Sequence, residues 1–107
     1  MAEQIRFEMY QGTSDGLRIR FKINGSVYTM GENDKLVLNV SSCVGAAKIL
    51  HKETTTDTIG FLPSDTVSID PGTYVFDVTL IKNSGSEIIK IIDPESKFII
   101  KGVVGNG

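Results

Sequence analysis

The stretch from residue 70 to residue 80 constrains the fold of this chain more than any other part of the sequence. It begins with Asp70-Pro71-Gly72, in which proline presets φ for a turn and glycine accepts the positive φ that other residues avoid. Apolar side chains then recur at every second position, which is typical of a β-strand with one face in a core. We expect the fold to be determined chiefly by Pro71, Gly72, Tyr74 and Phe76.

Shorter segments with the same two-residue period occupy much of the remaining chain. The clearest lies at 17–23, and Asn24-Gly25 is the strongest short signal for a hairpin leading from there to 27–30. About eight short strands, separated by turn signals, are expected at the spacing of a sandwich or barrel. The sequence therefore predicts an all-β protein, specifically an immunoglobulin-like antiparallel β-sandwich.

Two apolar segments near the end of the chain carry more hydrophobic residues than one core face needs. Residues 88–92 and 98–101 are predicted as separate strands, because the turn sequence at 93–95 lies between them. A strand that is apolar on both faces is either covered on both sides or open to a partner. We expect one domain over 1–107, in which 102–107 form a frayed tail.

Composition excludes several classes of function. The chain has 107 residues, with 11 Lys and Arg against 13 Asp and Glu, a net charge of -2. That balance makes nucleic acid an unlikely main partner and gives no attraction to an anionic membrane. No apolar run is long enough for a membrane helix, and the start of the chain does not resemble a signal peptide. We therefore expect no membrane partner and folding in the cytoplasm.

The side chains that usually carry chemistry are scarce. His51 is the only histidine and Cys43 the only cysteine, so neither a metal cluster of histidines nor a Ser-His-Asp triad is available. A Cys43–His51 nucleophile pair lacks any local signature, and an inert loop cysteine fits better. No calcium-loop or phosphate-loop pattern occurs. The sequence thus predicts no enzyme, no cofactor, no metal site and no catalytic residue.

Two charged features have a functional and a structural interpretation. Arg18, Arg20 and Lys22 form a basic row that could contact phosphate or an acidic partner, or could be a charged solvent face that discourages edge pairing. Asp77 lies in the strand of 70–80, opposite the apolar face. A salt-bridged strand position explains it better than recognition does.

The stretch from 62 to 80 resembles a known family. Leu62-Pro63-Ser64-Asp65-Thr66, followed by the turn at 70–72 and the strand after it, is similar to a pattern in immunoglobulin-like structural domains of phages and prophages of Gram-positive bacteria. The N-terminal domain of the upper baseplate protein of lactococcal siphophages is one such domain. Tyr74 stands where a tyrosine corner would, which predicts a hydrogen bond from its hydroxyl to backbone near 68–71.

The resemblance implies a non-catalytic virion structural protein of the baseplate, tail or head, made in the host cytoplasm. Its partners would be other virion proteins and further copies of itself. The surplus apolar residues are the candidate interface. They are Val75, Ile89, Ile91 and Ile99.

The alternative is a bacterial carbohydrate- or surface-binding β-sandwich module. Such a module needs exposed aromatic side chains in a groove. The chain has no tryptophan, and only Tyr10 and Tyr28 among its tyrosines are free of a fold role. We therefore rank this alternative below the virion protein.

Overall fold

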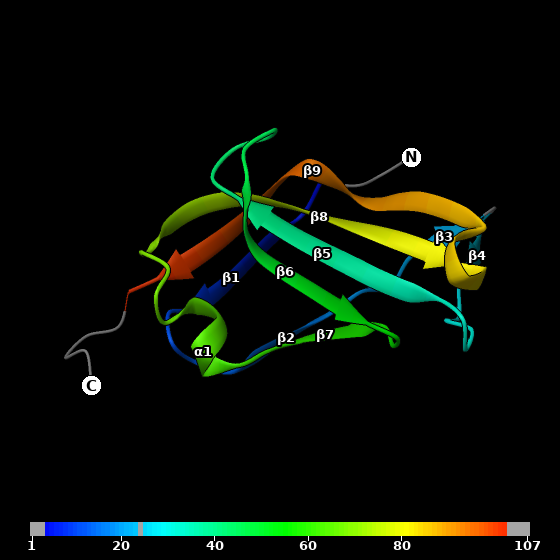
Figure 1. Cartoon of the computed structure of the whole chain (residues 1–107), viewed down its shortest axis with the longest axis horizontal. Helices are drawn as coiled ribbons and strands as arrows, with labels where there is room; N and C mark the ends of the chain where they lie inside the picture. The colour runs from blue at the N-terminus through cyan, green and yellow to red at the C-terminus, as the bar shows by residue number, and fades with distance from the viewer. Residues whose placement is uncertain (1–3, 24, 103–107) are drawn as a thin grey trace.

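The computed structural model describes residues 4–23 and 25–102, of which 58% lie in strands and 7% in helices (Figure 1). The first half of the chain forms β1 (Arg6–Tyr10), β2 (Asp15–Arg18), β3 (Lys22–Ile23), β4 (Ser26–Val27) and β5 (Lys35–Ser41). The second half forms β6 (Lys48–Thr54), β7 (Thr58–Phe61), α1 (Pro63–Thr66), β8 (Gly72–Lys82), the 3-10 turn η1 (Asn83–Gly85) and β9 (Glu87–Lys101). The protein is mostly β, as predicted.

Five strands form one curled sheet in the order β1-β9-β8-β5-β6. The pairs β9–β8, β8–β5 and β5–β6 are antiparallel, but β1 runs parallel to β9. The sheet is therefore mixed, and the prediction of a purely antiparallel arrangement is wrong. Two small antiparallel ribbons, β2–β7 and β3–β4, complete the strands of the described residues.

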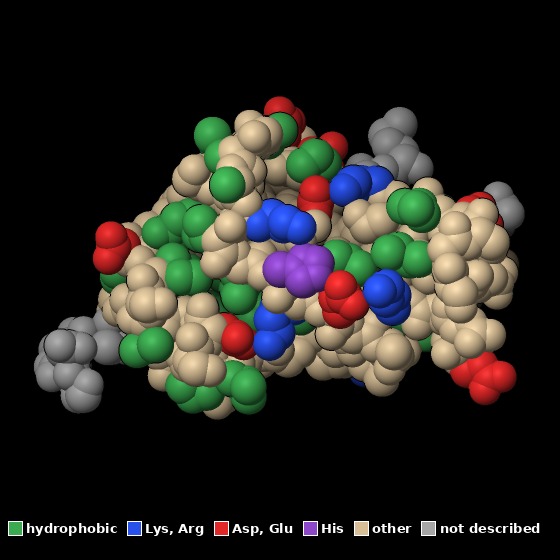
Figure 2. All heavy atoms as spheres, in the orientation of Figure 1, with side chains coloured by type: hydrophobic (Ala, Val, Ile, Leu, Met, Phe, Trp, Pro, Cys, Tyr) green, Lys and Arg blue, Asp and Glu red, His purple; other side chains and the backbone are tan. Residues whose placement is uncertain are grey.

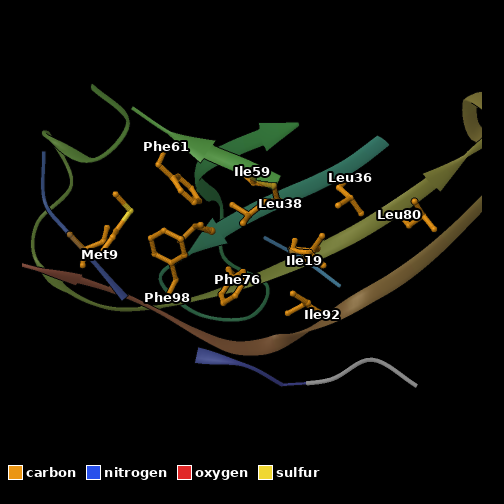
Figure 3. Close-up of a cluster of buried hydrophobic side chains, with 13 residues drawn as sticks. Met9, Ile19, Leu36, Leu38, Ile59, Phe61, Phe76, Leu80, Ile92 and Phe98 are labelled. Carbon is orange, nitrogen blue, oxygen red and sulfur yellow. The ribbon is translucent and has the colours of Figure 1, made fainter. Parts of the chain in front are cut away.

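The core lies between one face of this sheet and the β2–β7 ribbon (Figure 3). Phe98 of β9 is fully buried at its centre, with ring centroids 5.3 Å from Phe7, 5.5 Å from Phe61 and 5.6 Å from Phe76. Edge-to-face and tilted ring pairs of this kind add stability beyond the area they bury. The buried cluster comprises Met9, Ile19, Leu36, Leu38, Val40, Ile59, Phe61, Phe76, Val78, Leu80, Ile92, Phe98 and Ile100.

The predicted strand after the turn at 70–72 is confirmed as β8, the strand between β9 and β5. Phe76 is buried on the core face, and Tyr74 packs partly buried against the cluster. The Tyr74 hydroxyl donates a hydrogen bond to the backbone carbonyl of Asp70 at 2.6 Å, within the predicted window. The tyrosine thereby fixes the backbone just before β8 begins.

The prediction of a positive φ at Gly72 is wrong. Gly72 begins β8, and the described glycines with positive φ are Gly12, Gly25, Gly45 and Gly85. The chain bends earlier, because α1 and the turn after it already redirect the backbone, with the Ile69 N–H donating to the Thr66 carbonyl at 2.9 Å. Pro71 and Gly72 therefore mark the entry to the strand and not its turn.

The short helix α1 was not predicted, although its sequence signals are present. Pro63 stands in its first turn, where a missing N–H costs nothing. The Asp65 carboxylate accepts the Leu62 N–H at 2.7 Å and pairs with Lys52 at 2.9 Å. Burial acts to raise the pKa of Asp65, but these two partners together lower it below its ordinary value.

The two strands predicted at 88–92 and 98–101 are one strand, β9, whose register against β8 shifts at residues 93–95 and again at Ile91. Phe76 faces Ser96 and Val78 faces Ile92, so that Asp77 alone stands opposite residues 93–95. Proline is tolerated at a bulge because its missing N–H is not needed there. The Glu95 N–H donates to the Asp93 carboxylate at 2.8 Å, so that the turn chemistry shapes a bulge and the strand continues.

The predicted strand at 17–23 is interrupted. Its first part belongs to β2, and the chain leaves this ribbon at Ile19, whose N–H donates to the Asp57 carbonyl at 2.7 Å. The strand resumes only as the short β3, which pairs antiparallel with β4 as the predicted hairpin requires. Asn24 of the predicted turn lies outside the described residues. Gly25 has a φ of +82°, as such a turn requires. In the expected tail at 102–107, all but Gly102 lies outside the described residues.

Candidate functional site

The described structure contains a groove of about 790 Å³. We call it the β9 groove. It runs between residues 18–23 on one side and residues 89–92 of β9 on the other, with Ile5 near β1 completing the lining. Its volume lies in the range of about 300–1,000 Å³ that is typical of ligand sites.

The groove exists because β9 is flanked along only part of its length. β1 pairs with residues 97–101 of β9, and just before β1 the Ile5 carbonyl accepts the Lys97 N–H at 2.9 Å. Residues 87–92 pair with β8 alone among the strands of the described residues. Within the described residues, no backbone hydrogen bond reaches them from the groove side. This half of β9 is therefore an open sheet edge (Figure 1).

The groove has an apolar floor and a basic rim. Ile19 and Ile92 are buried beneath it, whereas Phe21, Ile89 and Ile91 are half-buried against the core. Its lining contains no acidic residue of the described chain. Four basic residues line it, and these are Arg18, Arg20, Lys22 and Lys90.

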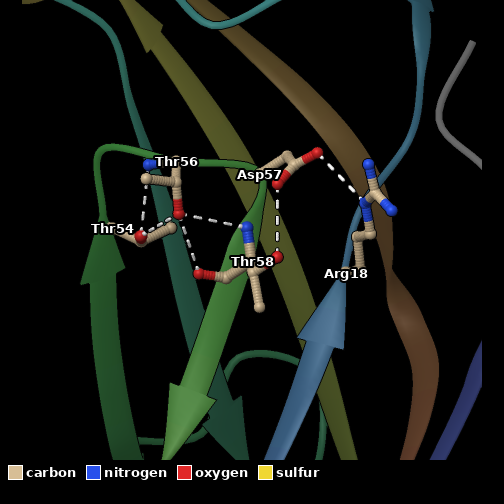
Figure 4. A network of polar contacts seen from close by, with 5 residues as sticks. All are labelled: Arg18, Thr54, Thr56, Asp57 and Thr58. Carbon is tan, nitrogen blue, oxygen red and sulfur yellow. Dashed lines mark hydrogen bonds and ion pairs between the residues drawn. The ribbon is translucent and has the colours of Figure 1, made fainter.

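Two of the basic residues already have partners. Arg18 pairs with Asp57 at 3.2 Å, and this contact lowers the pKa of Asp57 (Figure 4). Hydrogen bonds of Thr56 with Thr54 and Thr58 shape the turn that presents Asp57. Lys90 contacts Asp77 at 3.0 Å, which agrees with the salt-bridge interpretation of that aspartate. Arg20 and Lys22 are exposed, and neither forms an ion pair within the described residues.

The four candidate interface residues do not share a surface. Ile89 and Ile91 line the β9 groove and pack partly against the core. Val75 and Ile99 are half-buried on the opposite face of the sheet, since their neighbours Phe76 and Phe98 point into the core. The bulge of β9 changes the register of the strand, which the sequence did not reveal. Ile5, Phe21 and Ile23, which also line the groove, were missed because nothing in a local pattern joins them to 89–92.

Tyr28 is unavailable for sugar stacking. Its ring stacks on Phe21 at a centroid distance of 5.4 Å, and Lys82 lies over it at 5.2 Å. Its hydroxyl donates a hydrogen bond to the buried Asp34 carboxylate, which raises the pKa of Tyr28 and lowers that of Asp34. Tyr10 is 52% exposed, with Lys101 at 5.6 Å from its ring centre. No pair of open tyrosines therefore forms a carbohydrate platform.

The remaining reactive side chains lie apart from the groove. His51 is exposed on β6, within hydrogen-bond distance of Asn39 (2.6 Å) and Glu53 (2.9 Å). Both basic and acidic side chains surround it on this face (Figure 2). The contact with His51, followed by that with Lys35, lowers the pKa of Glu53. Cys43 is an exposed loop residue. Within residues 4–23 and 25–102, no group of three or more metal-ligating side chains occurs.

In the same part of the chain, no helix is long and apolar enough to cross a membrane. A comparison of the chain with protein-family models, with curated proteins and with solved structures found no match.

Proposed function

We propose that this chain is a non-catalytic structural module that works by binding other proteins through the β9 groove. The observation that carries the proposal is the open half of β9 beside an apolar floor. An open strand edge offers a row of backbone donors and acceptors that another chain can pair with. Natural proteins usually cover or block such an edge, and here the hollow beside it leaves room for a partner.

The proposed setting is a phage or prophage virion, in the baseplate, tail or head, with the chain folding in the host cytoplasm before assembly. The similarity of residues 62–80 to phage immunoglobulin-like domains supports this setting. One contact supports an immunoglobulin-like relationship. It is the hydrogen bond from the Tyr74 hydroxyl to the Asp70 carbonyl, which is expected of a tyrosine corner. The partners would be other virion proteins and further copies of this chain.

Light scattering during gel filtration tests the assembly function. The chain is measured alone and after co-expression with the products of neighbouring structural genes. We expect a mass above that of one chain, or a stable complex. A chain that stays monomeric at millimolar concentration and joins none of these proteins would contradict the proposal. Proteomics of purified phage particles tests the virion setting. Particles that do not contain this chain would refute it.

A variant pair links assembly to the groove. Ile88 is 67% exposed on the open half of β9, and Ile49 is 42% exposed on β6 at the opposite edge of the sheet. Ile88→Lys places a charge beside the open edge, a change that natural edge strands use to prevent pairing. We expect Ile88→Lys to weaken the assembly and the matched Ile49→Lys to leave it intact. The reverse result would assign assembly to the β6 edge.

A further inference from the structure

The chemistry of the β9 groove specifies its occupant. The first element is the backbone edge at residues 87–92, which in the described part of the chain pairs with β8 on one side only. The same strand accepts β1 as a neighbour at residues 97–101, where both sides are paired. An extended chain laid into the groove would give residues 87–92 the second neighbour that 97–101 already have.

The second element is the apolar floor. Phe21, Ile89 and Ile91 are half-buried and face the hollow from both walls. An extended segment presents side chains alternately to opposite sides. An occupant with apolar residues at every second position would therefore cover these three side chains.

The third element is charge. The groove is lined by basic residues and by no acidic residue of the described chain, although the whole protein carries a net charge of -2. Arg18 is engaged by Asp57, and Lys90 contacts Asp77 and Thr79. Arg20 and Lys22 are left to meet an incoming negative charge. Complementary charges of this kind select a partner and orient it.

We propose that the β9 groove binds an extended acidic segment of a partner protein, which adds a strand to residues 87–92 and places its carboxylates against Arg20 and Lys22. This inference rests on the proposed docking function and deepens it. A polypeptide fits better than single-stranded nucleic acid, because bases need open aromatic rings to stack on. The one aromatic ring of the lining, Phe21, is already stacked on Tyr28.

The test uses a fluorescent peptide that alternates glutamate with valine, titrated with the full chain and followed by anisotropy. Two peptides serve as controls, one alternating lysine with valine and one with the glutamates and valines in shuffled order. We expect only the alternating acidic peptide to bind, and to bind more weakly as salt rises. No binding of this peptide to the full chain would overturn the proposal.

Charge reversal at the rim locates the contact. We expect the double variant R20E/K22E to lose at least about tenfold in affinity. The matched double variant K48E/K97E makes the same change in net charge at two exposed lysines outside the groove lining. We expect it to bind the peptide as the natural chain does. Urea unfolding of both variants checks that they are folded, and equal losses in the two would overturn the proposed site.

Backbone methylation of the peptide tests strand addition itself. Two versions carry N-methyl groups on alternate residues, one on the odd and one on the even positions. Because an added strand donates from one alternate set toward its neighbour, at least one version should bind about tenfold more weakly or worse. If neither version is weakened, the peptide is held by charge alone and strand addition is wrong.

Other occupants give distinct results. A labelled oligothymidine that competes with the peptide and loses affinity in R20E/K22E would make the groove a general polyanion site, against the proposal. Dissociation of an oligomer of the chain by the peptide would make a second copy the occupant, again against it. If the peptide does not bind while the natural chain still assembles, the acidic-segment inference is rejected and the proposed docking function is not. A chain that does not assemble at all rejects the proposed function instead.

Discussion

The two halves of β9 differ in how many neighbouring strands they pair with and in how deeply their side chains are buried. Residues 97–101 lie between β1 and β8 and bury Phe98 and Ile100 almost completely. Residues 87–92 pair with no strand of the described residues other than β8, and Ile88 among them is 67% exposed. We call these the closed half and the open half. Both are rich in isoleucine, so composition does not distinguish them.

The difference arises from the bulge at residues 93–95 and from the position of β1. The bulge changes the register of β9 against β8. β1 pairs with residues 97–101, and just before it the Ile5 N–H donates to the Ser96 hydroxyl at 2.9 Å. Beyond this point β9 has no second neighbour within the described residues. Polar and proline residues in the middle of an apolar strand thus separate a core segment from a segment that pairs on one side within the described residues.

Truncation of a large side chain gives the largest expected contrast between the halves. Phe98→Ala removes a fully buried ring that contacts three other rings, and it should cost about 3–5 kcal/mol in the free energy of unfolding. Ile88→Ala in the open half should cost less than about 1 kcal/mol, because most of the side chain is already in water. Urea unfolding measures both. Similar losses in the two variants would show that the halves are equally packed.

Amide hydrogen exchange gives a second contrast. In the closed half both sets of amides, those facing β1 and those facing β8, are expected to be protected. In the open half the amides that face away from β8 should exchange at least about a hundredfold faster than those that face it. Exchange followed by NMR would contradict the comparison if residues 87–92 were protected on both sides in the free protein.

The Tyr74 contact tests the entry to β8 beside the closed half, where Tyr74 stands opposite Phe98. Tyr74→Phe keeps the ring and removes only the hydroxyl bond to the Asp70 carbonyl. We expect a loss of about 1 kcal/mol in the free energy of unfolding, with the cost confined to one hydrogen bond. Tyr10→Phe is the matched control, since that tyrosine is exposed, and it should change little. A Tyr74→Phe variant as stable as the natural chain would show that this hydrogen bond contributes nothing to the free energy of unfolding.

Local sequence patterns predicted the individual strands of this fold better than they predicted which strands pair with each other. The alternation around Phe76 placed β8 and its buried face correctly, and the position of Tyr74 predicted its hydrogen bond. Both depend on residues within a few positions of each other. The antiparallel pairing of β3 with β4 was likewise predicted from a local turn signal, of which Gly25 lies within the described residues.

Non-local features could not be obtained in this way. Alternation at 17–23 indicates which side chains are apolar, but it does not show that the backbone leaves β7 at Ile19. The turn sequence at 93–95 is genuine, yet whether it ends a strand or makes a bulge depends on the register with β8. The parallel pairing of β1 with β9 joins residues about 90 positions apart. The groove was missed for the same reason, although its basic rim was noted.

The smallest expected effect concerns an exposed ion pair across the closed half. Glu8 of β1 contacts Lys101 of β9 at 2.9 Å and also pairs with Arg6. The hydrogen bond from Lys101, followed by that from Arg6, lowers the pKa of Glu8 below its ordinary value of 4.5, and the same contact raises the pKa of Lys101. Both side chains are partly in water, so the stabilisation is small and weakens further with salt.

The sign of its pH dependence follows from the lowered pKa of Glu8. A carboxyl whose pKa is lower in the folded state contributes stability above its unfolded pKa and loses it as pH falls through the folded one. Glu8→Gln should therefore be slightly less stable than the natural chain at neutral pH, and the gap should close as pH falls below about 4. Glu32→Gln, at an exposed turn position, is the control with the same change in charge. A gap that persists in acid, or that appears equally in the control, would show that the β1–β9 contact owes nothing to this pair.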